Sequence, residues 1–350
     1  MGRKVDRYFM NKRVEWIDIA RGIGIILVVL GHSVTTVIRE NSSIAMSIYT
    51  TVYFFHLPLL FFVSGLAFDL STDKYEKQAF KKYFGSKCKR LMLPYVMYSF
   101  LVYLIFSIAN LIPKVGSVLA KMSYGKLSFL SWLRGLVIGN NIYSEHLWYL
   151  YSLFVLSAMA FILLKLTGKK YKFILLVITI IMWFFLRMSS EYDVIWKTSY
   201  RGIWFALGCA AGVKRSYSKT EKGIILIIGA LIFGFNSFLW GLMENIVPIY
   251  IYDIFKIAVL MYIFVVVSQI FEELGDKLIK WLGENSMCIY LFHQPFLGSG
   301  LGVVLFSILH LPVAVCIVVS LIACIVIPIL IGELLKRPWL KVLRLLLLGG

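Results

Sequence analysis

Residues 16–33 read WIDIARGIGIILVVLGHS, an apolar stretch that begins with charged side chains and ends on Gly31-His32. Its length is close to the roughly 20 apolar residues that a helix needs to cross a bilayer. On an α-helix Arg21 and His32, eleven positions apart, share one face to within about 20° and lie about 16 Å apart along the axis. Ionisable groups inside a membrane are costly and often mark a functional site. The stretch therefore predicts a membrane helix that carries functional groups.

A purely structural interpretation of the same helix is also open. Arg21 could extend to the cytoplasmic headgroups, while His32 could pack between neighbouring helices. Asp18 stands one turn before Arg21, so the helix carries three polar groups. That third group favours the functional interpretation.

The composition is that of a multi-pass membrane protein. The chain has 350 residues, of which 60% are hydrophobic, with a mean hydropathy of +0.84 and a formal charge of +18. These values exclude an ordinary soluble domain. Basic cytoplasmic loops explain the charge, so we expect no nucleic-acid partner. The five cysteines lack metal-binding spacing, and we expect no metal.

The apolar runs predict an all-α bundle of about ten transmembrane helices, with residues 1–350 as one integral membrane domain and 334–350 as a short cytoplasmic amphipathic tail. The predicted cytoplasmic segments hold 26 Lys and Arg residues, and the predicted outer segments and span edges hold 8. By the positive-inside rule, both termini are expected in the cytoplasm. The expected spans cover 15–37, 44–68, 91–112, 147–164, 173–189, 200–213, 223–240, 249–271, 285–308 and 313–333.

Four of the five histidines fall inside or at the ends of these spans. Histidine exchanges protons near neutral pH, so a buried one is a candidate base, although many membrane histidines only bridge helices. His56 lies in FFHLPLLFFVSGLAF, residues 54–68, just before Pro58. The proline breaks the backbone ladder there, which suits either a cavity or a packing kink. His293 ends GENSMCIYLFH, residues 283–293, before Pro295, and a polar helix start followed by a proline kink would explain this stretch without a function.

Glu145 and His146 open the fourth predicted span, in the sequence EHLWYL. A carboxylate beside an imidazole can orient it or favour its charged form. An acidic helix start followed by an interfacial aromatic belt at Trp148 explains the same residues. Both interpretations stay open.

Two basic side chains precede the third predicted span, in KCKRLMLPY at residues 87–95. Lys87 and Arg90 are three positions apart, so on an α-helix they share a face. With Arg21, which is also expected near the cytoplasm, they could clamp phosphates. The pair could equally be charges that only fix the topology.

Taken together and in chain order, these stretches resemble the acyltransferase-3 family of integral membrane acyltransferases. The resemblance covers essentially the whole chain. The matching features are Asp18-x-x-Arg21-Gly22, the Arg21 to His32 spacing, FFHLPLLFFVSGLAF, the basic pair before LMLPY, HLWYL at 146–150 and GENSMCIYLFH at 283–293. The family typically has arginine at the first basic position, where this chain has Lys87, and a lysine lacks the planar fork that grips phosphate.

The resemblance implies a multi-pass enzyme of a bacterial-type cell membrane with ten spans. It would move an acyl group, most commonly acetyl from acetyl-CoA, to a hydroxyl of an envelope carbohydrate or a lipid-linked sugar. Many members carry an additional extracytoplasmic domain that finishes the reaction. Since this chain shows none, we expect it to act alone on a lipid-linked sugar or to pass the group to an extracytoplasmic partner.

Specific roles follow from the pattern and the resemblance together. We expect His32 to act as general base or transient acyl carrier, with Glu145 as the second catalytic residue. Binding of acyl-CoA phosphates is assigned to Arg21, Lys87 and Arg90. Substrate contacts or support are assigned to Asp18, His56, His146, Trp148 and His293.

A transporter is the alternative from another functional class. Intramembrane Arg, His and Glu residues would also suit a proton relay in an exporter of an acylated sugar or related metabolite. The sequence shows no inverted repeat, which many transporters have. A further enzymatic alternative is the membrane part of a racemase-linked or peptidoglycan-modifying system.

Overall fold

The computed structural model describes residues 14–121, 126–186, 194–243 and 249–350, and within these ranges the chain is helical without strands. It divides into two compact units. The smaller unit comprises Met1–Ile26 and Gly212–Ser286, and the larger comprises Leu27–Ala211 and Met287–Gly350. Helix α2, Glu15–Ser33, belongs to the smaller unit in its first half and to the larger in its second.

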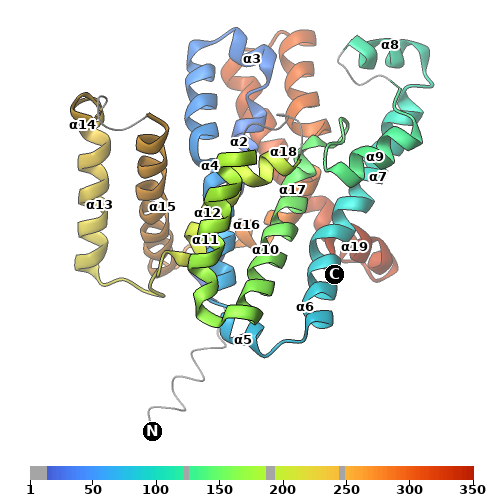
Figure 1. The fold of residues 1–350 in the computed structure, drawn as a ribbon. Coiled ribbons are helices and arrows are strands. Elements are labelled where there is room, and N and C mark those ends of the chain that lie inside the picture. The colour runs from blue at the N-terminus through green and yellow to red at the C-terminus, as the bar shows by residue number, and fades with distance from the viewer. Residues whose placement is uncertain (1–13, 122–125, 187–193, 244–248) are drawn as a thin grey trace. The chain divides into compact units, whose positions relative to one another are not determined.

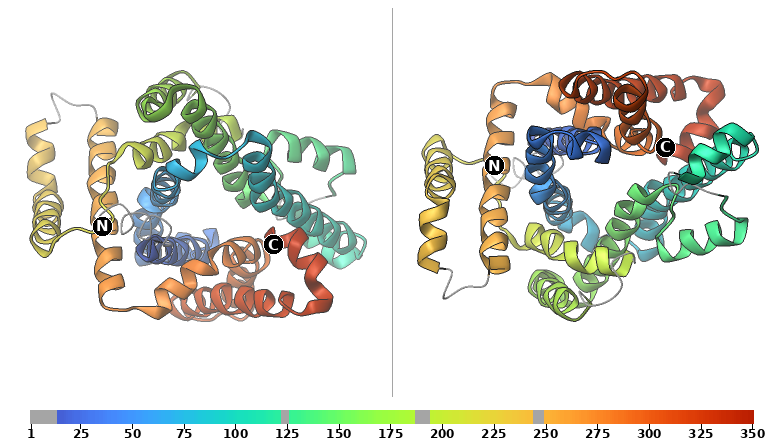
Figure 2. Two further views of the ribbon diagram at one scale, coloured as in Figure 1. Left: turned by 90° about the horizontal axis from the view of Figure 1, so that it is seen from below. Right: turned by 90° about the horizontal axis from the view of Figure 1, so that it is seen from above.

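The smaller unit contains a pair of long helices, α13 (Lys219–Gly234) and α15 (Ile249–Glu273), which stand side by side in Figures 1 and 2. Gly229 allows the close approach, because a Cβ there would lie 2.4 Å from the side chain of Ile263. Where the first turn of α13 meets the last turn of α15, Lys222 forms an ion pair with Glu273 at 2.5 Å, although Lys222 is only 4% exposed. The short helix α14, Asn236–Met243, follows α13.

Helix α16, Lys277–Glu284, packs against the first turns of α2. A Cβ on Gly283 would lie 1.7 Å from the carbonyl oxygen of Asp18, and a Cβ on Gly22 would lie 2.1 Å from that of Ile279. Such contacts need glycine, as in other close membrane-helix pairs. The fully buried Trp16 donates its indole N–H to the Arg215 carbonyl at 2.9 Å. The charged start of α2 is therefore tightly packed.

The larger unit is centred on α4 (Ser43–Asp69) and α12 (Val194–Ala210), which lie against each other. A Cβ on Gly65 would lie 2.1 Å from the Phe205 carbonyl oxygen, and one on Gly208 would lie 2.2 Å from that of Phe62. Helices α10 (Trp148–Thr167) and α11 (Tyr171–Leu186) pack on α12, while α7 (Leu93–Ala109) contacts α19 (Lys341–Leu348). The tail predicted at 334–350 thus ends in a helix docked on α7.

Apart from the long helix α18, the remaining elements are short, and several are irregular. The π-helical turns, which bond i to i+5, interrupt two of the predicted spans. These elements are α3 (Thr36–Glu40), α5 (Thr72–Glu76), α6 (Phe80–Lys87), η1 (Cys88–Met92), α8 (Pro113–Lys121), α9 (Phe129–Ile138), η2 (Glu145–Leu147), η3 (Gly168–Lys170), α17 (Ser286–Phe292), η4 (Phe296–Leu301), η5 (Val304–Ile308), α18 (Val313–Leu335) and η6 (Pro338–Leu340).

The structure confirms a helical protein with several membrane-length segments. Among the described residues, six segments are long and apolar enough to cross a membrane, and a seventh is added if α17 and the helix over Phe296–Ile308, bent by 57°, form one broken span. The six are Glu15–Ser33, Ser43–Asp69, Phe80–Ala109, Glu145–Phe185, Ile251–Glu273 and Val313–Leu335.

The count of ten spans stays a prediction. A helix lies within the described part of each predicted span, but the described lengths of α11, α12 and α13 are 16, 17 and 16 residues, fewer than the roughly 20 that a straight crossing needs. The orientation of the termini also stays a prediction. The basic residues that set the N-terminal orientation lie outside the described residues, as does Arg187.

Candidate active site

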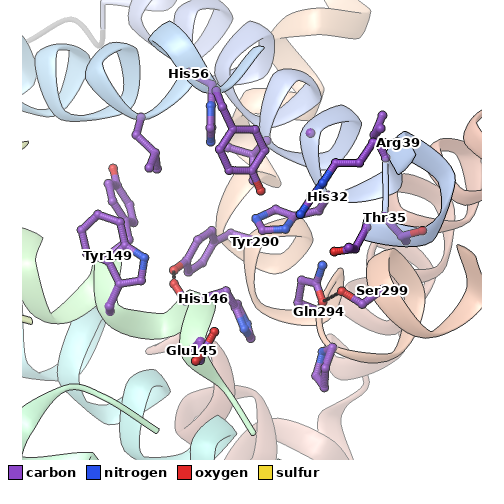
Figure 3. Close-up of a pocket in the computed structure, with 18 of the residues that line it drawn as sticks. His32, Thr35, Arg39, His56, Glu145, His146, Tyr149, Tyr290, Gln294 and Ser299 are labelled. Carbon is purple, nitrogen blue, oxygen red and sulfur yellow. Dashed lines mark hydrogen bonds between the residues drawn. The ribbon is translucent and has the colours of Figure 1, made fainter. Parts of the chain in front are cut away.

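A cavity of about 580 Å³ opens in the larger unit (Figure 3). This volume is within the range of small-molecule sites. The cavity lies at the end of α2 that carries His32, and its walls come from α2, α3, α4, η2, α10, α12, α17 and the segment after α17. The polar and aromatic residues that line it include His32, Thr35, Arg39, Tyr53, His56, Glu145, His146, Trp148, Tyr149, Lys197, Tyr290, Gln294 and Ser299.

Three histidines from distant parts of the chain meet beside this cavity. The ring centroids of His32 and His293 are 5.1 Å apart, and those of His146 and His293 are 5.6 Å apart. His293 is completely buried, whereas His32 is half-buried on the cavity wall. His56 joins the group through Tyr53, whose ring lies 4.7 Å from His56 and 6.1 Å from His32.

Backbone contacts fix which ring nitrogen of each buried histidine is available. The Nδ1 of His293 lies 2.7 Å from the Tyr290 carbonyl oxygen, and the Nδ1 of His56 lies 2.7 Å from that of Val52. A carbonyl oxygen only accepts, so Nδ1 carries the proton, and in a neutral ring Nε2 keeps its lone pair. The Nε2 atoms of His293 and His146 find no hydrogen-bond partner among the described residues. The cluster therefore presents the lone pair of the His293 Nε2, which has no partner among the described residues.

The break after α17 brings His293 into the interior. Helix α17 ends at Phe292 and the chain continues into the π-helical turn η4, with a bend of 57° between the two segments. The Gln294 carbonyl, freed by the break, accepts a hydrogen bond from the Tyr98 hydroxyl at 2.6 Å. Non-helical backbone is tolerated within a membrane bundle where it is satisfied in this way. The hydroxyl of Tyr290 donates to the His146 carbonyl, which ties this segment to η2.

The predicted residues Glu145, His146 and Trp148 lie together on the cavity wall. Glu145 is exposed at the start of η2, and the partly exposed Trp148 begins α10. The cavity therefore gathers six of the residues predicted for the site, counting the adjacent His293. These are His32, His56, Glu145, His146, Trp148 and His293.

The predicted phosphate-binding residues lie elsewhere in the chain. Arg21 belongs to the smaller unit and forms an ion pair with Asp18 at 3.1 Å, where Asp18 is 1% exposed and Arg21 is partly exposed. Lys87, in the larger unit, ends α6 with its Nζ 5.5 Å from the centroid of the Tyr83 ring. Arg90 is exposed in η1. Since η1 is π-helical, the α-helical spacing that put Lys87 and Arg90 on one face does not hold there.

Sequence reasoning missed several lining residues. Arg39 and Lys197 entered only as charges at predicted outer span edges, and Tyr53, Gln294 and Thr35 were not singled out. One available signal was that both cations fall at the same predicted end of the bundle as His32. For Gln294, its position between His293 and Pro295 was the signal.

The described residues contain no group of three His, Cys, Asp or Glu side chains arranged to hold a metal ion.

Comparison with known proteins gives one family. A family model described as an acyltransferase domain, that of acyltransferase-3, matches residues 14–331, nearly the whole chain. No curated protein and no solved structure gives a significant match.

Proposed function

The chain belongs to the acyltransferase-3 family, and from this premise we propose that it moves an acetyl group from cytoplasmic acetyl-CoA to a hydroxyl of an envelope carbohydrate or lipid-linked sugar. Family membership and the membrane-length helices make it a membrane acyltransferase. The observation that supports the detailed proposal is the cluster of His32, His146 and His293 beside a 580 Å³ cavity.

The reaction needs a base close to the acceptor. The acceptor oxygen attacks the thioester carbonyl, so that a C–O bond forms and the C–S bond breaks. His32 takes the proton of the hydroxyl as general base and returns it to the leaving thiolate, which departs as CoA. Alternatively, an imidazole nitrogen of His32 first attacks the thioester carbonyl, so that a C–N bond forms, the C–S bond breaks and CoA leaves with the ring proton. The hydroxyl oxygen then attacks the acyl-imidazole, so that the C–N bond breaks and the hydroxyl proton passes to the imidazole. The half-buried His32 on the cavity wall suits both routes.

The neighbouring histidines support His32. His293, whose ring lies 5.1 Å from that of His32, presents an Nε2 without a partner among the described residues. We assign it and His146 to orienting His32 and sharing its proton. Glu145, exposed on the same wall, would stabilise the imidazolium that forms. Trp148 offers an aromatic face for a sugar ring, and His56 supports the wall through Tyr53.

We assign the binding of the acyl donor to the cations that are predicted to lie near the cytoplasmic surface of the membrane. Arg21, Lys87 and Arg90 would bind the phosphates of acyl-CoA from the cytoplasm, with Asp18 holding Arg21. Along α2, Arg21 and His32 are separated by eleven residues, or about 16 Å, which leaves room for a pantetheine arm. The acceptor would be a lipid-linked sugar in the surrounding membrane, or an extracytoplasmic partner that receives the acyl group.

The test uses purified protein in nanodiscs with radiolabelled acetyl-CoA and a lipid-linked sugar extract. We expect CoA thiol release together with label in the sugar fraction, and the loss of both in His32→Gln. Mass analysis of envelope sugars from cells with and without the protein identifies the product. Movement of an acylated sugar across the membrane without thioester cleavage would instead establish the exporter alternative.

A further inference from the structure

Two cations line the same cavity as His32, and among the described residues they outnumber its lining carboxylate, Glu145. Arg39, on α3, lies over the Tyr49 ring at 4.2 Å, and Lys197, on α12, lies over the Trp148 ring at 5.8 Å. Neither forms an ion pair in the part of the chain that the structure describes. Glu145 is the acid among the described lining residues, so the lining carries a net positive charge.

Two buried side chains beside Arg39 lack partners. Gln294 is 5% exposed and its Nε2 donor has no hydrogen-bond partner, and Thr35 is 7% exposed with an Oγ1 in the same condition, both among the described residues. The Gln294 Oε1 is already occupied, because it accepts from the Ser299 hydroxyl at 3.0 Å. Figure 3 shows Thr35, Arg39, Gln294 and Ser299 grouped on one side of the cavity. Buried donors are normally satisfied, so this side is suited to a ligand with acceptor oxygens.

The backbone around these donors is adapted to their side chains. The segment FLGSGLG, residues 296–302, follows the helix break. A Cβ on Gly298 would lie 2.6 Å from the Gln294 Nε2, and one on Gly302 would lie 2.7 Å from the Thr35 Cγ2. The two glycines therefore leave the room in which Gln294 and Thr35 reach the cavity.

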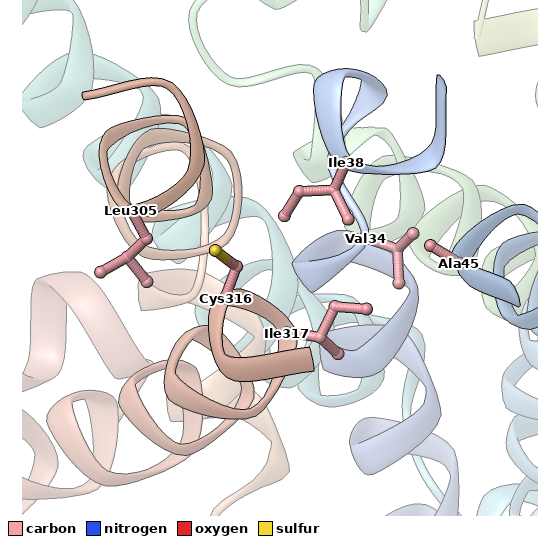
Figure 4. Close-up of a cluster of buried hydrophobic side chains, with 6 residues drawn as sticks. All are labelled: Val34, Ile38, Ala45, Leu305, Cys316 and Ile317. Carbon is pink, nitrogen blue, oxygen red and sulfur yellow. The ribbon is translucent and has the colours of Figure 1, made fainter. Parts of the chain in front are cut away.

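Arg39 is held firmly although its helix has only five residues. Figure 4 shows that α3 is anchored by a buried apolar cluster that joins it to α4, η5 and the start of α18. The cluster comprises Val34, Ile38, Ala45, Leu305, Cys316 and Ile317. An aromatic stack then links Arg39 to the base, since the Tyr49 and Tyr53 centroids are 4.0 Å apart and Tyr53 neighbours His32 at 6.1 Å. An anion at Arg39 is thus positioned relative to His32.

We propose that the acyl acceptor carries an anionic group, a phosphate or a carboxylate, which Arg39 and Lys197 bind together with the Gln294 and Thr35 donors while its hydroxyl faces His32. The inference rests on the proposed function, because it names the acceptor class of the same site. Guanidinium and ammonium groups bind anionic oxygens through charge-assisted hydrogen bonds, and neither cation is engaged in an ion pair among the described residues.

The test compares three acceptors that each carry a dodecyl chain and differ only in their head group. These are dodecyl glucoside, which is neutral, a dodecyl phosphodiester of glucose at C1, and dodecyl glucuronide. With protein in phosphatidylcholine nanodiscs, we expect KM for at least one anionic acceptor to be about tenfold lower than for the glucoside, and the phosphodiester and glucuronide arms identify which anion is bound. Arg39→Gln and Lys197→Gln should each raise that KM by roughly ten- to a hundredfold, the usual effect of losing a charged hydrogen bond.

Two controls make the result specific. Arg134→Gln removes an exposed cation of α9 that does not line the cavity, and should leave KM unchanged. The glucoside KM should be unchanged in Arg134→Gln, and in Arg39→Gln and Lys197→Gln it should change much less than the KM for the anionic acceptor. Equal use of all three acceptors, with no effect of either lining variant, would overturn the inference. So would variants that alter only the response to phosphatidylglycerol in the nanodisc, since the cations would then hold a lipid headgroup.

A binding measurement distinguishes a failure of this inference from a failure of the proposed function. Calorimetry of the phosphodiester and the glucoside with the nanodisc protein needs no acyl transfer. If the protein cleaves no acetyl-CoA and acylates none of the acceptors, the proposed function fails. Anion-selective binding that is lost in Arg39→Gln would still sustain the assignment of the anion site, and the absence of selective binding would overturn it.

Discussion

The imidazole rings of His32 and His293 lie 5.1 Å apart, although one ends α2 near the start of the chain and the other follows α17 near its end. The contact joins a half-buried ring that faces the cavity to a completely buried one. Its position gives His32 a partner that is itself oriented by the Tyr290 carbonyl.

Replacement of His32 tests the chemistry most directly. His32→Gln should keep the fold and acyl-CoA binding but lower transfer by roughly 10²- to 10⁴-fold, the usual effect of removing a general base. If His32 carries the acyl group, rapid quench of the wild type should trap acyl-imidazole on it. His310→Asn, in an exposed position with φ of 52°, serves as the matched control. A folded and fully active His32→Gln protein would return this histidine to helix packing.

Removal of Arg90 tests the phosphate clamp. Arg90→Ala should weaken acyl-CoA binding by about 1.5–3 kcal/mol, or roughly ten- to a hundredfold, because a charged hydrogen bond to phosphate is lost. Lys87→Arg should be tolerated or improve binding, since arginine supplies the planar fork. Lys82→Ala, exposed on α6, is the control. Unchanged affinity for acyl-CoA in Arg90→Ala would leave the basic pair as a topology signal.

The close contact between α4 and α12 predicts that one added methyl group at either of its glycines lowers the stability of the protein. Gly65→Ala and Gly208→Ala should each destabilise the protein by about 1–3 kcal/mol, because the added Cβ would lie 2.1 and 2.2 Å from opposing carbonyl oxygens and overpack the contact. Gly85→Ala has no atom within 4 Å of the new Cβ and should be neutral or slightly stabilising. Thermal unfolding in nanodiscs measures all three, and equal midpoints would contradict the close packing.

Orientation can be mapped with reporters. A reporter fused after Gly350 and another inserted near Thr72 should both report the cytoplasm, and one near Ser117 should report the outer side, because of the bias of 26 to 8 basic residues. Accessibility labelling at the same positions provides an independent readout. A cytoplasmic signal at Ser117 would rule out the ten-span arrangement.

The N-terminus of α13 predicts a pH-dependent contribution to stability. Hydrogen bonds from Lys214, and then from the Ser218 backbone, lower the pKa of Glu221 from 4.5 to about 2. Because the folded pKa is the lower one, the stabilisation is present above about pH 4.5 and is lost as the pH falls through about 2. The difference in unfolding temperature between wild type and Glu221→Gln should therefore shrink as the pH falls below 4.5. A difference that grows towards acid would contradict this assignment.

The sequence by itself determined the class of protein and selected six of the residues at or beside the cavity. Apolar runs of bilayer length demand helices, since only hydrogen bonds within a segment satisfy the backbone in lipid. The histidines and Glu145 could be selected because ionisable groups in such runs are costly and rarely incidental. The family followed from the order of the motifs, and the match over residues 14–331 confirms it.

Only the tertiary structure decided which of these residues meet. His32, His146 and His293 are neighbours because a helix break turns His293 inward, and the bend depends on satisfaction of the Gln294 carbonyl by Tyr98, a partner remote in the chain. Likewise, Arg39 and Lys197 counted only as topology charges until α3 and α12 brought them to the lining of one cavity. Periodicity assigns a side chain to a face of its own helix, whereas the partner that this face meets depends on packing between helices far apart in the sequence.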